Sequence, residues 1–233
     1  MSTTVKNKKI KASDMFFLAA LAFLALLAEP IFRSLVLENF FYAIDIGSFG
    51  WTLLLRTVCI TIWIFSGLGL VKMAKKECEL SIFEKNKPAK LEWILTASIT
   101  TAFAAYFIIT NFNIYAANIL GLVNIRNITL FLTLCIFNLF KACILTLIIA
   151  FIQKGFDAIF KFGNKVPFGG IVLGIIWVIM ALASSGVAIM WQTWVGLIVY
   201  GTVLGLIYTL SGEKTRYALP FIAVVYVLIG ILS

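Results

Sequence analysis

The chain has 233 residues and a net charge of +9; 62% of its residues are apolar, only 12% are charged, and none is histidine. Soluble domains are about 45–50% apolar and about 25% charged, so this composition excludes a soluble domain, a disordered chain and a disulfide-linked scaffold. The lack of histidine excludes Ser-His-Asp triads, Cys-His dyads and histidine-ligated zinc. We therefore expect a single membrane domain over residues 1–233, with no cofactor and no metal site.

Seven apolar runs follow a basic tail over residues 1–14. A membrane-spanning helix needs about 20 mostly apolar residues. The runs are continuous, whereas β-barrel strands alternate polar and apolar residues in pieces of about ten. The sequence therefore predicts an all-α, polytopic membrane helix bundle with about seven transmembrane helices. The runs lie at residues 15–37, 50–72, 92–110, 128–152, 167–185, 191–210 and 218–232.

The first run has some features of a secretory signal peptide. Lysines precede Met15–Ala28, and Ala28 lies near a plausible cleavage point. The run continues past Pro30 to Leu37, however, which is a spanning length. We therefore expect a first helix that is retained in the membrane.

The cations predict how the helices are oriented. Of the 19 Lys and Arg residues, 15 lie on alternate connections, and the opposite connections carry only Arg126. Positive charge gathers on the cytoplasmic side of membrane proteins, so we expect the N-terminus inside and the C-terminus outside. The net charge is thus a topology signal, and no folded basic domain exists to bind nucleic acid. The 15 residues are Lys6, Lys8, Lys9, Lys11, Lys72, Lys75, Lys76, Lys85, Lys87, Lys90, Lys154, Lys161, Lys165, Lys214 and Arg216.

Two pairs of glycines have the spacing that permits close helix packing. Gly170 and Gly174 are four residues apart in the fifth run, and Gly201 and Gly205 are four apart in the sixth. Small residues at this spacing share one helical face and let two backbones approach closely. We expect these four glycines to serve helix packing.

Ionisable side chains inside spanning segments are costly and are candidates for function by default. Glu29 and Arg33 are four apart on the first helix and can pair, Arg56 lies in the second helix, and Lys141 lies in the fourth, one turn after Asn138. These five residues are the candidate binding residues. They either line a polar cavity that holds a substrate or anionic group, or form clamps between helices.

The last three runs resemble the CPBP family, the CAAX-protease and bacteriocin-processing proteins also called the Abi family. The resemblance rests on Phe151–Phe160, Phe168–Trp177, the Gly-rich stretch Gly196–Tyr208 and the proline-led stretch Ala218–Val224. It covers residues 150–230 or so. Active members are glutamate-dependent intramembrane proteases that use a Glu-Glu-x-x-x-Arg motif and two histidine-containing motifs.

Transferring those motifs onto this chain shows that the catalytic residues are missing. Every matching position holds an aliphatic residue, so the resemblance implies a relative that lacks the family's protease mechanism. Ala28–Arg33 reads as half of the first motif, on an unexpected helix, and we interpret Glu29 and Arg33 as a salt bridge. The two glutamates would fall near Ile144 and Leu145, the arginine near Ile149, the histidines near Ala181 and Val224, and the Asn partner near Leu228.

Three functions follow as hypotheses. The first is a catalytically inactive, CPBP-like protein of the cell membrane that acts by binding, as a scaffold, regulator or subunit of a membrane complex, with bacteriocin self-immunity as one such role. Its partners are the lipid bilayer and another membrane protein or a second copy. The second is a transporter, or transporter subunit, for an anionic solute held by the intramembrane cations. The third is an active intramembrane CAAX-type protease.

Overall fold

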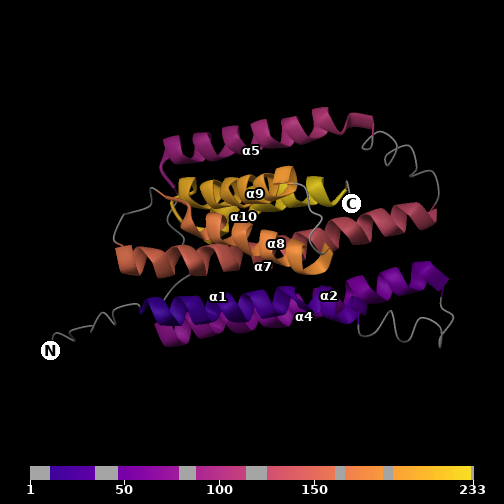
Figure 1. Ribbon diagram of the computed structural model, residues 1–233, viewed down its shortest axis with the longest axis horizontal. Helices are drawn as coiled ribbons and strands as arrows, with labels where there is room; N and C mark the ends of the chain where they lie inside the picture. The colour runs from indigo at the N-terminus through magenta and orange to yellow at the C-terminus, as the bar shows by residue number, and fades with distance from the viewer. Residues whose placement is uncertain are drawn as a thin grey trace.

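A computed structural model describes residues 11–34, 47–78, 88–113, 125–160, 166–185 and 191–231 of the chain. Throughout these residues the regular secondary structure is helical (Figure 1). The all-α class predicted from hydropathy is therefore confirmed. The helices are α1 (Ala12–Leu26), α2 (Ala28–Phe32), α4 (Gly47–Cys78), α5 (Lys90–Thr110), α7 (Ile125–Phe160), α8 (Phe168–Ser185), α9 (Trp191–Leu210) and α10 (Thr215–Gly230).

The lengths and compositions of the helices are those of a membrane protein. Five helical segments are long and apolar enough to cross a bilayer, with α1 and α2 together forming the first, Ala12–Phe32. Two shorter apolar helices, Phe168–Leu182 and Thr215–Gly230, occupy the fifth and seventh predicted runs. Each of the seven runs thus contains a helix, and the end of the first run, residues 35–37, falls outside the described residues.

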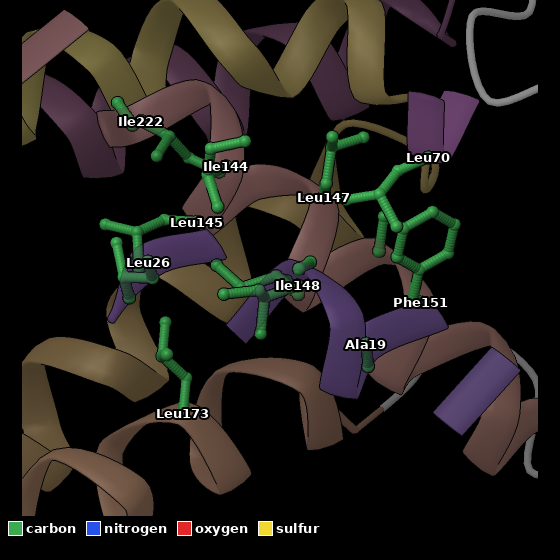
Figure 2. Packing of buried hydrophobic residues seen from close by; sticks show 14 of the residues in the cluster. Ala19, Leu26, Leu70, Ile144, Leu145, Leu147, Ile148, Phe151, Leu173 and Ile222 are labelled. Carbon is green, nitrogen blue, oxygen red and sulfur yellow. The ribbon is translucent and has the colours of Figure 1, made fainter. Parts of the chain in front are cut away.

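Helix α7 lies at the centre of the bundle. It packs against α1 and α4 on one side and against α8 and α10 on the other, while α5 lies at the edge and covers α9 and α10 (Figure 1). The middle of α7 is fully buried: Leu145, Ile148, Ile149 and Phe151 are each 0% exposed. Figure 2 shows how side chains from α1, α4, α8 and α10 surround this stretch.

The predicted end of the fourth run is wrong by eight residues, because α7 continues from residue 152 to Phe160. Hydropathy ends the run at Gln153, a polar residue that the structure buries. The Gln153 side chain donates to the Val166 carbonyl (3.1 Å) and accepts from the Gly169 N–H (3.1 Å). These bonds satisfy the amide and tie the end of α7 to the start of α8, so the polar side chain does not end the helix.

The ends of the helices that carry the predicted cytoplasmic cations meet at one end of the bundle. Phe16 near the start of α1 packs against Phe156 near the end of α7 (5.3 Å between ring centroids). Lys154 of α7 forms an ion pair with Glu213, in the turn between α9 and α10. This arrangement agrees with the alternation of cations along the sequence, and the placement of that end in the cytoplasm stays a prediction.

The four glycines predicted for helix packing lie together where α8 crosses α9. A Cβ at Gly201 would lie 2.6 Å from both the Gly170 carbonyl oxygen and the Gly174 nitrogen. A Cβ at Gly205 would lie 2.7 Å from the Gly170 Cα. The neighbours are backbone atoms, so the two helices approach as closely as their main chains permit, and only hydrogen fits between them at these positions.

Candidate functional site

The site begins at a break in the first spanning segment. Helix α1 ends at Leu26, and α2 starts at Ala28 with Pro30 inside it. Proline has no N–H to donate and disturbs the hydrogen-bond ladder of the preceding turn. The indole Nε1 of Trp63, from α4, donates to the Ala25 carbonyl at 2.9 Å. A neighbouring helix thus supplies a side-chain donor beside the break.

Replacing Trp63 by Phe tests this bond. Trp63 is 1% exposed, and its indole donates within the buried end of α1. We expect Trp63→Phe to lower the free energy of unfolding by about 1–3 kcal/mol, because the Ala25 carbonyl loses a donor and a cavity remains where the larger ring was. Trp93→Phe is the control, since Trp93 is 42% exposed on α5. Equal losses from both variants would contradict a specific role for the indole N–H.

Glu29 and Lys141 form the central contact of the site. Lys141 Nζ, on α7, lies 2.5 Å from Glu29 Oε2, and the side chains are 21% and 17% exposed. Arg33 lies farther from the same carboxylate, with its guanidinium 3.8 Å from Glu29 Oε1, and its side chain is 63% exposed. Sequence spacing predicted the Glu29–Arg33 pair. The structure adds that the short, shielded bond is made with Lys141.

Aromatic rings and an amide surround the Lys141 ammonium. Its Nζ lies 5.7 Å from the centroid of the Phe137 ring and 6.0 Å from that of Tyr226, on α10. Ring faces at these distances attract a cation. One turn earlier on α7, Asn138 is 5% exposed and packs directly against Gly230 of α10. The site therefore joins α2, α7 and α10 around one acid and two cations.

Arg56 does not belong to this site. Its guanidinium donates to the Leu130 carbonyl (2.6 Å) and to the Thr133 hydroxyl (2.8 Å), both near the start of α7. From Thr133 to Lys141 is eight residues of helix, or about 12 Å along the axis. The structure thus brings Glu29, Arg33 and Lys141 together with Asn138 one turn away, and places Arg56 at a separate point.

The positions that the CPBP resemblance assigns to catalysis do not share one environment. Ile144, Leu145 and Ile149 are 1%, 0% and 0% exposed in the core, whereas Val224 is 51% exposed on α10. A protease site needs its carboxylates and imidazoles around one water. These positions are thus divided between the core and the outer surface of the bundle.

Reasoning from the sequence missed several residues that shape the polar parts of the bundle. Trp63 and Tyr226 read as ordinary apolar helix residues, and only tertiary contacts show that they serve the broken helix and the Lys141 ammonium. Of the four cysteines, Cys59 and Cys78 are buried, and Cys135 and Cys143 are partly buried.

Comparison of the chain with protein-family models, curated proteins and solved structures finds no match.

Proposed function

We propose that this chain is a multi-pass protein of the cell membrane that acts by binding, as a subunit or regulator of a membrane complex, on a CPBP-like helical frame that lacks catalytic residues. The observation that carries the proposal is the closed interior around α7. The Glu29–Lys141 pair lies near the middle of this helix, and the Lys154–Glu213 pair lies nearer its C-terminal end.

Between these two ion pairs α7 is packed with apolar side chains. From Ile144 to Ile152 each residue is at most 4% exposed. Thr146, the polar member of this stretch, donates its hydroxyl to the Ala142 carbonyl of its own helix (2.7 Å). A solute or catalytic water would have to displace this packing, which costs free energy at each buried side chain. The packing favours a protein that works through its surface.

Arg33 is the group that we assign to partner contact. The cluster contains two cations, Arg33 and Lys141, and one acid, Glu29, so it carries a net positive charge. Lys141 makes the short contact with the Glu29 carboxylate. The exposed Arg33 guanidinium makes only a long contact, 3.8 Å, with the same carboxylate. An arginine near the membrane surface binds a carboxylate of a partner protein in a fixed geometry.

A charge reversal tests the proposal. The tagged full-length chain is extracted from its native membrane in mild detergent, and its complexes are separated on a native gel and identified by cross-linking. We expect a defined complex that Arg33→Glu removes and that the control Arg216→Glu, an exposed cation at the start of α10, leaves intact. Recovery of the wild-type chain only as a monomer would contradict the proposal. Cleavage of membrane peptides that Glu29→Gln abolishes would replace it with the protease hypothesis.

One observation favours transport of an anionic solute as a second candidate. Among the described residues, the Arg56 guanidinium donates to two neutral acceptors, the Leu130 carbonyl and the Thr133 hydroxyl. A cation in a spanning helix held by neutral acceptors attracts an anion. Thermal stabilisation of the purified chain by an anionic solute, lost in Arg56→Ala or Lys141→Ala, would support transport over partner binding.

A further inference from the structure

A second group of polar side chains lies near the C-terminal end of α7, away from the Glu29–Lys141 pair. Lys154 Nζ lies 2.6 Å from Glu213 Oε2, and the Glu213 side chain is only 2% exposed. The Asp157 carboxyl, one turn further along α7, is within hydrogen-bonding reach of the Glu213 carboxyl and accepts from Gln153 Nε2 at 3.2 Å. Two acids and one lysine thus meet where α7 touches the turn between α9 and α10.

If both acids are ionised, one oxygen of the Glu213 carboxylate lacks a hydrogen-bond donor among the described residues. Glu213 Oε2 accepts from Lys154, whereas Glu213 Oε1 is buried and has no donor among the described residues. The neighbouring Asp157 is an acceptor only when it is ionised, and two carboxylates in contact repel. One proton on Asp157 provides an O–H that donates to Glu213, and it leaves the group with one positive and one negative charge.

We propose that Asp157 and Glu213 form a proton-binding site, in which one proton held between the two carboxyl groups closes the contact between α7 and the α9–α10 turn. Loss of this proton leaves two negative charges beside one lysine in a shielded place. The contact then weakens, and the turn is freed from α7.

The backbone conformation of the α9–α10 turn also indicates that Glu213 is held in place by specific contacts. Glu213 has a φ of +56° and follows Gly212 at +67°, a conformation that is unfavourable for a residue with a side chain. The Tyr208 hydroxyl donates to the Glu213 carbonyl (2.9 Å), and the Glu213 N–H donates to the Tyr208 carbonyl (3.2 Å). A strained residue held by several contacts is typical of a functional position.

Other charged groups lie near the turn. Glu92 of α5 lies against Gly212, with its Oε2 3.1 Å from where a Cβ would be, and the Lys214 side chain approaches the same point. Of these charged groups, Lys154 opposes retention of the proton. Arg216, at the start of α10, is exposed.

The test replaces the Asp157 carboxyl group, which donates only when it is protonated, with an amide. In Asp157→Asn the side-chain N–H₂ donates to Glu213 at every pH. We expect the melting temperature of the wild-type chain in detergent to fall by about 2–4 °C from pH 5 to pH 8, the size of change that one weakened contact produces in a chain of this length. Asp157→Asn removes this fall, so that it melts above the wild type at pH 8. The control Asp14→Asn, an acid in the first turn of α1, keeps the wild-type profile.

An infrared measurement on the wild-type chain reads the proton directly, and two variants then assign it to the Asp157–Glu213 pair. We expect a protonated carboxylic acid band in the wild-type chain at pH 5 that disappears at pH 8, and that is absent from Asp157→Asn and Glu213→Gln. Wild type and Asp157→Asn with the same pH dependence of melting, or a wild-type chain without this band at pH 5, would overturn the proposal.

Discussion

Lys141→Met is expected to lower the free energy of unfolding by about 3 kcal/mol. Methionine keeps the shape of the side chain and removes its charge, which leaves Glu29 as a carboxylate with 17% of its side chain exposed. Removing one partner of a buried ion pair typically costs about 3–5 kcal/mol, because the remaining charge loses its compensation. Reversible unfolding of the purified chain in mixed micelles, followed by tryptophan fluorescence, measures the loss.

Arg33→Met is the matched control for this substitution. It also removes a cation beside Glu29, but the lost contact is 3.8 Å long and the Arg33 side chain is 63% exposed. Exposed ion pairs contribute at most about 1 kcal/mol, so we expect a change below ~0.5 kcal/mol. A loss from Arg33→Met equal to that from Lys141→Met would mean that the short Glu29–Lys141 bond is not the dominant contact.

The two cations are also expected to be coupled. Once Lys141 is absent, Arg33 is the cation that still contacts the Glu29 carboxylate among the described residues, so Arg33→Met should cost more in the Lys141→Met background than in the wild type. Conversely, Glu29→Gln should recover part of the loss in that background, with an interaction free energy of about 1–3 kcal/mol. Additive effects of Glu29→Gln and Lys141→Met would contradict the ion pair.

The limits of prediction from sequence are visible in this same cluster. Continuous apolar runs predict helices well, because lipid requires every backbone group to be bonded within its own segment. Spacing on one helix also found Glu29 and Arg33. It could not pair Glu29 with Lys141, which lies 112 residues away and comes close to it because α1, the helix before α2, packs along α7.

The end of α7 was missed for a related reason. Hydropathy treats Gln153, Lys154 and Asp157 as loop residues because they are polar. Their bonds run to Val166, 13 residues away, and to Glu213, 59 residues from Lys154. A polar side chain continues a buried helix when a distant segment satisfies it, and a local pattern does not contain that information. The glycine pairs were easier to predict, because close helix packing requires small residues at a fixed spacing, which a local pattern does contain.

Gly201→Ala is expected to lower the free energy of unfolding by about 2–3 kcal/mol. The added methyl would lie 2.6 Å from the Gly170 carbonyl oxygen and 2.7 Å from the Gly174 Cα. Both are backbone atoms, so no side chain can rotate away and the helices must separate. Gly196→Ala on the same helix is the control, because a Cβ there meets nothing within 4 Å. Unfolding in mixed micelles should show little change in that variant, or a slight gain from higher helix propensity.

Combining Gly201→Ala with Gly170→Ala distinguishes one shared crossing from two separate contacts. A Cβ at Gly170 would lie 2.6 Å from the Gly205 Cα, and Gly170 is itself a neighbour of Gly201. The first methyl already forces α8 and α9 apart, so the second enters space that has been opened. We therefore expect the double variant to lose less stability than the sum of the two single losses. Strict additivity would mean that the helices accommodate each methyl locally, and that the four glycines do not set the distance between α8 and α9.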